Sequence, residues 1–167
     1  MDEEMVAALQ GVYRPRKVRT LLVAESPSTA ERFFYLGNSP LFRYTYLAFQ
    51  DVCGLPAGAP TEFLAWFRDH GFFLDNLAQH SIGHLPQPAR RAAAMLWVPS
   101  LAERLAIYRP HNLVAVMKSL ERPVAQAIEL AGISLEHMAV LPFPARSVRN
   151  QWAYREQLGH LVGAWGV

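Results

Sequence analysis

The residues best suited to chemistry follow directly after an apolar run at residues 18–24. Glu25, Ser26 and Pro27 supply a carboxylate, a hydroxyl and a rigid turn. Apolar residues bounded by turn formers predict a buried strand, here over residues 19–24. In an open α/β sheet, ligands bind in the crevice beyond the carboxyl ends of the strands. We therefore expect the functional site at the exit of this first strand.

Three further polar positions lie at the ends of later apolar runs. Asp75 and Asn76 interrupt the run at residues 71–79, Lys118 closes the run at 111–118, and residues 141–146 follow the run at 137–141. We expect Asp75 to be structural. An amide can pair with the edge of a planar heterocycle, aromatic rings can stack on its face, and arginines can hold phosphates. This set of residue types favours a nucleotide or nucleic-acid ligand.

The elements that must position these residues alternate between strands and helices. Strands are expected over residues 19–24, within 71–79, and over 111–118 and 137–141. Helices are expected over residues 2–12, 41–52, 61–70, 99–108, 123–130 and 149–165, with irregular chain at 28–39 and a long loop at 80–91. This alternation predicts a three-layer α/β/α domain spanning residues 1–167, with a central, mostly parallel four-stranded sheet.

Composition narrows the class of protein. The 167 residues are 51% hydrophobic and 18% charged, which is typical of a globular chain. Cys53 is the only cysteine, which excludes an internal disulfide or a thiolate metal centre, and the six histidines lack metal-site spacing. No apolar run approaches the roughly 20 residues of a membrane helix, and the acidic amino terminus does not resemble a targeting signal. We expect a cytoplasmic monomer without metal or cofactor.

The formal net charge of +2 does not by itself indicate a partner, but the basic residues are clustered. One cluster spans residues 14–19, before the first strand. A second, at residues 144–155, contains arginines and no acidic residue. The two clusters are expected either to flank a groove for a phosphate backbone or to be ordinary solvated surface.

In order and spacing, these segments resemble the motifs of the uracil-DNA glycosylase superfamily over residues 19 to about 165. The first motif of that family, typically Gly-x-Asp/Asn/Ala-Pro, stands here as Ala24-Glu25-Ser26-Pro27. Asn76 occupies the position of the asparagine that pairs with the base. The family's His-Pro-Ser-Pro loop stands here as Leu141-Pro142-Phe143-Pro144.

The resemblance implies hydrolysis of the N-glycosidic bond of a deaminated base, uracil or hypoxanthine, flipped out of DNA. Glu25 would act on the attacking water and Ser26 would hold it. Phe143 would wedge into the space that the base leaves. Base contacts are expected from Pro27, Phe34, Tyr35 and Asn76, and DNA contacts from Lys118, Leu141, Pro142, Phe143, Arg146 and Arg149.

Departures from the family pattern keep two other functions open. Ser26 replaces the usual water-activating Asp or Asn, Leu141 replaces the histidine that stabilises the departing base, and Phe143 replaces a serine. A nucleic-acid or nucleotide-binding module of the same fold, without catalysis, is the main alternative. A small-molecule hydrolase with Ser26 as nucleophile would need His80 or His84 beside it.

Overall fold

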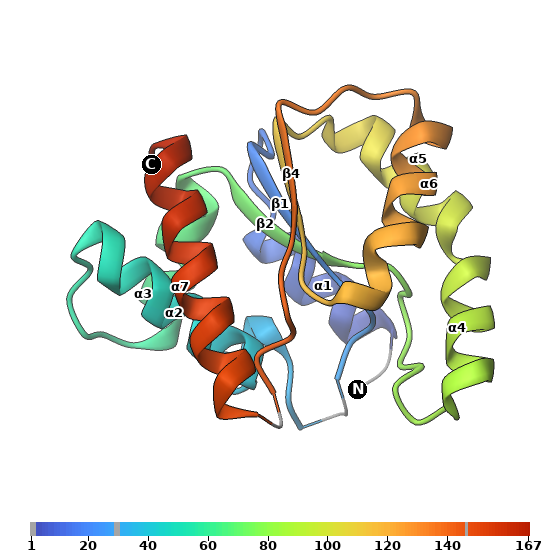
Figure 1. The fold of residues 1–167 in the computed structure, drawn as a ribbon. Coiled ribbons are helices and arrows are strands. Elements are labelled where there is room, and N and C mark those ends of the chain that lie inside the picture. The colour runs from blue at the N-terminus through green and yellow to red at the C-terminus, as the bar shows by residue number, and fades with distance from the viewer. Residues whose placement is uncertain (1–2, 29–30, 146) are drawn as a thin grey trace.

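A single parallel sheet organises the computed structural model, which describes residues 3–28, 31–145 and 147–167 (Figure 1). Its four strands, in the spatial order β2-β1-β3-β4, are β1 (Thr20–Ala24), β2 (Phe72–Asn76), β3 (Asn112–Ala115) and β4 (His137–Val140). All three strand pairs are parallel. The predicted three-layer α/β/α fold with a parallel four-stranded sheet is therefore confirmed.

Helices cover both faces of this sheet (Figure 1). One layer contains α2 (Pro40–Cys53), α3 (Pro60–Asp69) and α7 (Val148–Trp165), and the other contains α5 (Val98–Tyr108) and α6 (Glu121–Ala131). The remaining elements are α1 (Glu3–Tyr13), which contacts β2, α4 (Gln87–Leu96), which contacts α5, and the short helical turns η1 (Phe34–Leu36) and η2 (Lys118–Leu120). None of the described helices combines the length and apolar character needed to cross a membrane.

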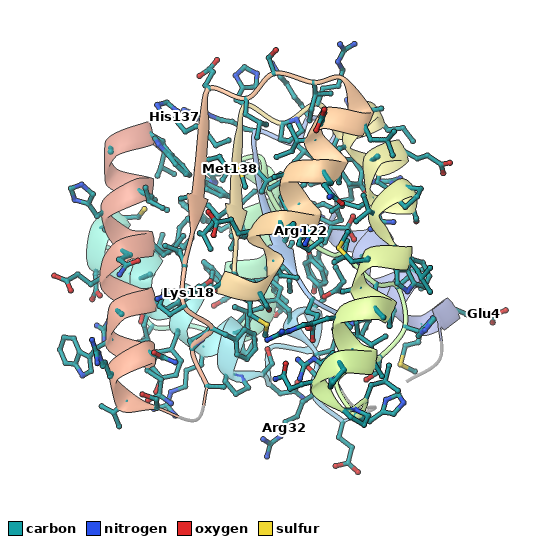
Figure 2. The ribbon with its side chains drawn as sticks, turned by 45° about the vertical axis from the view of Figure 1, so that its right-hand side comes forward. Glu4, Arg32, Lys118, Arg122, His137 and Met138 are labelled. Carbon is teal, nitrogen blue, oxygen red and sulfur yellow. The ribbon has the colours of Figure 1, made fainter. Side chains whose placement is uncertain are left out.

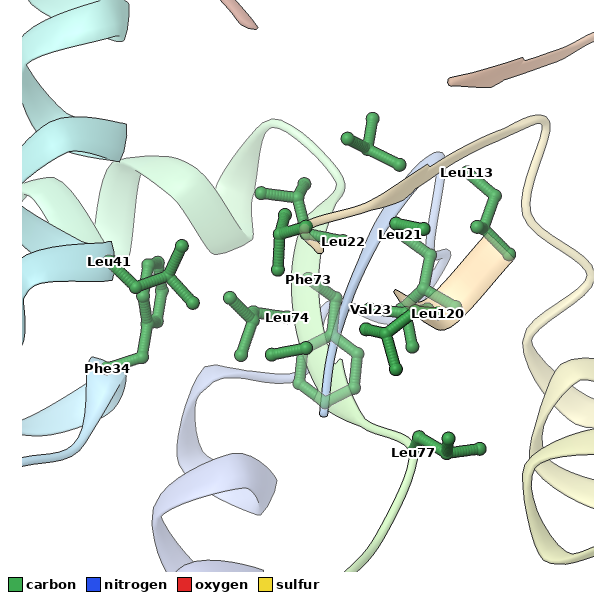
Figure 3. Packing of buried hydrophobic residues seen from close by; sticks show 14 of the residues in the cluster. Leu21, Leu22, Val23, Phe34, Leu41, Phe73, Leu74, Leu77, Leu113 and Leu120 are labelled. Carbon is green, nitrogen blue, oxygen red and sulfur yellow. The ribbon is translucent and has the colours of Figure 1, made fainter. Parts of the chain in front are cut away.

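The hydrophobic core lies on both sides of the central strands because helices shield both faces. Every residue of β1, β2 and β3 is buried, and the core continues into the aromatic residues of α2 and α3. Figure 3 shows Leu21, Leu22 and Val23 of β1 beside Phe73 of β2. The edge strand β4 is the exception, with His137 and Met138 exposed.

Helix α4 is not part of the sequence prediction, whereas the bounds of the other described α-helices lie within one or two residues of the predicted ones. Residues 80–91 were predicted to be a loop, yet α4 begins at Gln87 because Pro88 lies in its first turn, where a missing N–H costs no intrahelical bond. Helix α3 begins at Pro60, one residue before the predicted start. The Ala59 amide donates to Glu62 Oε2 at 2.9 Å, which satisfies an amide that the helix cannot pair.

A buried pair of hydroxyl groups joins α2 to α7. Thr45 Oγ1 donates to the Leu41 carbonyl at 2.7 Å, so the 2.8 Å contact between Thr45 and Tyr154 is a bond donated by the phenol. Burial raises the pKa of Tyr154 above the ordinary value of 10. Tyr154 therefore stays protonated in the folded chain at pH values at which the unfolded chain has already ionised.

This shifted pKa predicts a specific loss of stability in alkali. Between pH 10 and 12 the native state binds more protons than the unfolded state, so the free energy of unfolding falls as pH rises. We expect Tyr154→Phe to lower stability by about 1 kcal/mol at pH 7, through the lost hydrogen bond, and to make the alkaline decline shallower. Urea unfolding at several pH values measures both effects, and an unchanged alkaline slope would contradict the prediction.

Candidate functional site

The polar strand ends predicted from the sequence meet at one edge of the sheet. The register aligns Ala24 with Asn76, and Val23 and Val140 with Ala115, so Glu25 and the segment from Leu141 follow the same edge. A cavity of about 1140 Å³ opens there. Its lining comes from the segments that follow β1, β2, β3 and β4, together with α4. Loops distant in sequence thus enclose one space, as the fold prediction required.

Glu25 lies in this cavity and pairs with Arg90, which is not among the predicted site residues. The Glu25 side chain is 9% exposed. Arg90 of α4 donates to Glu25 Oε2 from Nε at 2.6 Å, and its Nη2 contacts the same oxygen. Oε1 receives neither contact. The ion pair holds the carboxylate at the strand exit and links α4 to β1.

Asn76 is the most unusual polar group of the site. It is 2% exposed and lines the cavity, and its Nδ2 has no hydrogen-bond partner among the described residues. A buried amide without a partner costs about 1–3 kcal/mol. Backbone bonds from Leu77 to the Ala24 carbonyl and from Ala78 to the Glu25 carbonyl fix this strand end beside β1. The Nδ2 donor is thus fixed at the cavity wall without a partner among the described residues.

Asp75 points to the opposite face of the sheet, because successive strand residues alternate sides. Its carboxylate is 1% exposed. It accepts from Arg104 Nε at 2.7 Å and from the backbone N–H of Asn76 at 2.7 Å. Arg104 Nη2 also donates to the Asn76 carbonyl at 2.7 Å. This buried network agrees with the structural role expected for Asp75, and it immobilises the backbone that carries Asn76.

Most of the residues predicted for the site do line the cavity, but three of the described ones do not. The cavity lining includes Glu25, Ser26, Pro27, Phe34, Asn76, Lys118, Pro142 and Phe143. Tyr35, Leu141 and Arg149 are not part of it. Arg146 lies outside the described residues.

Tyr35 and Leu141 are occupied elsewhere. The Tyr35 hydroxyl donates to the Leu74 carbonyl and accepts from the Leu74 amide, both at 2.8 Å. It therefore satisfies backbone groups of the edge strand β2 that no neighbouring strand pairs. Burial, and secondarily the charge of Asp75, raise its pKa well above 10. The Leu141 side chain is 2% exposed in the core, and its amide continues the pairing of β4 with the Ala115 carbonyl.

The basic residues of α4 and its surroundings are not among those predicted from the sequence. Arg32, Arg90, Arg91 and Arg122 all line the cavity. The run ARRAAAML at residues 89–96 is rich in strong helix formers and follows two prolines, which is a typical helix start. The same prolines are also turn formers, so the sequence pattern equally indicates a loop over this stretch. Of the two basic clusters in the sequence, the one at residues 14–19 precedes β1 and lies at the opposite end of the strands. The clusters at residues 14–19 and 144–155 therefore do not flank this cavity together.

Other chemical groups add little to the site. Among the described residues no three His, Cys, Asp or Glu side chains gather as metal ligands. Ser26 Oγ accepts from the Ile82 amide at 3.4 Å, while His84 lines the cavity without a hydrogen bond to that hydroxyl and His80 packs edge to face on Trp97.

No protein-family model matches this chain, and no curated protein is significantly similar to it in sequence.

Proposed function

We propose that this protein is a DNA glycosylase that hydrolyses the N-glycosidic bond of a deaminated base flipped out of DNA. The observation that carries the proposal is the buried, unpaired Asn76 amide in the same cavity as the Glu25 carboxylate. An amide at the floor of a cavity can pair with the carbonyl of uracil or hypoxanthine. Phe34 and Leu74 supply apolar lining for a flat ring.

In the proposed reaction, the bond between the base nitrogen and the sugar C1′ breaks as a bond from C1′ to a water oxygen forms. The base leaves with the electron pair, and the proton lost by water goes to Glu25 and then to the departing base. Glu25 orients the water and offsets the positive charge that develops on the sugar. Flipping the nucleotide costs a few kcal/mol, least for a mispaired base.

The direct test is base excision. The protein is incubated with duplexes that carry a single uracil, hypoxanthine or xanthine, and abasic sites are then cleaved with alkali. We expect strand breaks at one or more of these lesions and none on undamaged duplex. DNA affinity should fall as salt concentration rises, because bound phosphates release counterions. Absence of breaks on all three lesions would overturn the glycosylase proposal.

One observation favours the alternative, a nucleic-acid-binding module without catalysis. Arg90 already contacts Glu25 Oε2 through two nitrogens, which occupies one of the two oxygens that could orient a water molecule. Salt-dependent binding to DNA without excision of any of the three bases would support this alternative. Binding to neither damaged nor undamaged DNA would reject both functions.

Asn76→Ala is expected to separate stability from recognition. The substitution removes a buried donor without a partner, so the free energy of unfolding should stay within about 1 kcal/mol of the wild-type value or rise. Excision should slow by about tenfold or more, because the lost contact is to the base itself. Urea unfolding and single-turnover excision measure the two effects. A variant that is strongly destabilised, or that excises at the wild-type rate, would contradict the role given to Asn76.

A further inference from the structure

A second hollow, of about 780 Å³, lies between α2 and α7, and none of its lining residues also lines the cavity at the strand ends. Two glycines of α7 form part of its wall. A Cβ on Gly159 would lie 3.2 Å from Val52 Cγ2 of α2, and one on Gly163 would lie 3.3 Å from Val52 Cγ1. The glycines thus bring α2 close to α7 and leave no side chain to fill the space beside Val52, which is 42% exposed.

Large apolar side chains project from the same face of α7. Val148 is 69% exposed, and Trp152, which lines the hollow, is 67% exposed. Positions 148, 152, 159 and 163 point to one side of the helix, because steps of four, seven and four residues are close to whole turns. Figure 2 shows α7 at the left margin of the view, on the opposite side of the molecule from α4. An exposed tryptophan beside a hollow is typical of a protein contact surface.

The spacing of the indole and the hollow makes this face complementary to itself. Trp152 precedes Gly159 by seven residues, which is about 10 Å along the helix. When α7 of a second copy lies antiparallel about a two-fold axis between residues 155 and 156, each Trp152 meets Gly159 of the other copy, and each Val148 meets Gly163. One two-fold rotation therefore places both indoles in both hollows, which is the geometry of an isologous dimer.

The charges at the centre of the face favour the same arrangement. Arg155 donates to Asp51 from Nε and Nη2, each at 2.6 Å, which leaves Nη1 without an acceptor among the described residues. Glu156 is exposed and has no cation within ion-pair distance in the part of the chain that the structure describes. The two-fold axis places Arg155 of each copy opposite Glu156 of the other, so opposite charges meet twice. A nucleic acid would instead bring its phosphates against two carboxylates, Asp51 and Glu156.

We propose that this protein forms a two-fold symmetric homodimer through α2 and α7, with Trp152 of each copy seated in the hollow of the other. This dimer replaces the monomer that the sequence predicts, and it does not depend on the proposed function. A face of two helices, about 27 Å long for the 18 residues of α7, lies near the lower limit of about 1,200 Å² for specific interfaces. We therefore expect a reversible dimer with a dissociation constant of about 10 µM.

Sedimentation equilibrium of the full chain, at concentrations around this dissociation constant, tests the association. Trp152→Ala should weaken the dimer at least about thirtyfold, because tryptophans that fill interface hollows are typical hot spots. The side chain is exposed in the single chain, so this variant should fold normally. Ile107→Ala is the matched control, since it removes an apolar side chain of α5 that is 77% exposed and lies outside this face. It should leave the dissociation constant unchanged.

A cysteine at the two-fold axis tests the antiparallel register. In a Cys53→Ser background, which removes the only native thiol, Glu156→Cys should form a disulfide between two copies under mild oxidation, because position 156 lies beside its own symmetry mate. Gln157→Cys is the control. This residue is also exposed, but it is rotated by about 100° around α7 relative to residue 156, away from residues 148 and 152, so it should not cross-link.

A chain that stays monomeric at all concentrations, a dimer that Trp152→Ala leaves unchanged, or equal cross-linking at positions 156 and 157 would exclude this dimer. A monomer in which duplex DNA changes the fluorescence of Trp152, measured as the difference from Trp152→Phe, would make the face a nucleic-acid contact and exclude the dimer as well. Base excision is measured separately, so failure of the proposed function leaves the result for the dimer unaffected.

Discussion

Replacing Asp75 by alanine is expected to lower the free energy of unfolding by about 3–5 kcal/mol, since it removes a buried carboxylate and leaves the partly buried Arg104 guanidinium and the Asn76 backbone amide without their acceptor. The Asp75 carboxylate is 1% exposed and Arg104 is 17% exposed. Asp75 also accepts from the backbone amide of Asn76 at 2.7 Å and from the side chains of Gln10 and Gln79 at 3.4 and 3.3 Å. Urea unfolding at pH 7 measures the loss.

The protein provides a matched control for this prediction in a second Asp–Arg pair on its surface. Arg155 donates to both carboxylate oxygens of Asp51 at 2.6 Å, and these hydrogen bonds lower the pKa of Asp51. Both side chains are about a third to a half exposed. Asp51→Ala should therefore cost no more than about 1 kcal/mol. If the two variants lost the same stability, burial would not be the reason for the importance of Asp75.

The second large effect is expected for Glu25→Gln, which should slow base excision by at least about 100-fold. Glutamine keeps the shape of the side chain but can neither take a proton from water nor offset the charge that develops on the sugar. Arg90 loses its counterion, but the glutamine carbonyl oxygen still offers it an acceptor and its side chain is 22% exposed to water, so the fold should persist. Single-turnover excision from a uracil-containing duplex measures the rate.

The control for this variant is Glu129→Gln, an exposed carboxylate on α6 that does not line the cavity. It should excise at the wild-type rate. DNA affinity measured with the same duplex should change little in Glu25→Gln, because the basic residues that line the cavity are unchanged. Wild-type excision by Glu25→Gln would exclude this carboxylate from the chemistry and favour water activation by another group.

Local patterns in the sequence were sufficient to predict the layers of the fold and the edge at which the site lies. The apolar runs around Leu22, Phe73 and Val114 are continuous because both faces of their strands are buried, and continuous runs of this kind predict a parallel sheet. Parallel strands place their carboxyl ends at one edge, so the positions of Glu25 and Asn76 followed from the order of elements alone.

Only the tertiary structure decided which partners these residues have. The Glu25–Arg90 and Asp75–Arg104 pairs join residues 65 and 29 positions apart, and no local pattern encodes such distances. Tyr35 is aromatic and was predicted to stack on the base, but its hydroxyl donates to the Leu74 carbonyl of the edge strand β2. Strand periodicity sets the side of the sheet to which a residue points, whereas its partner depends on how helices pack across that sheet, a property of the whole chain.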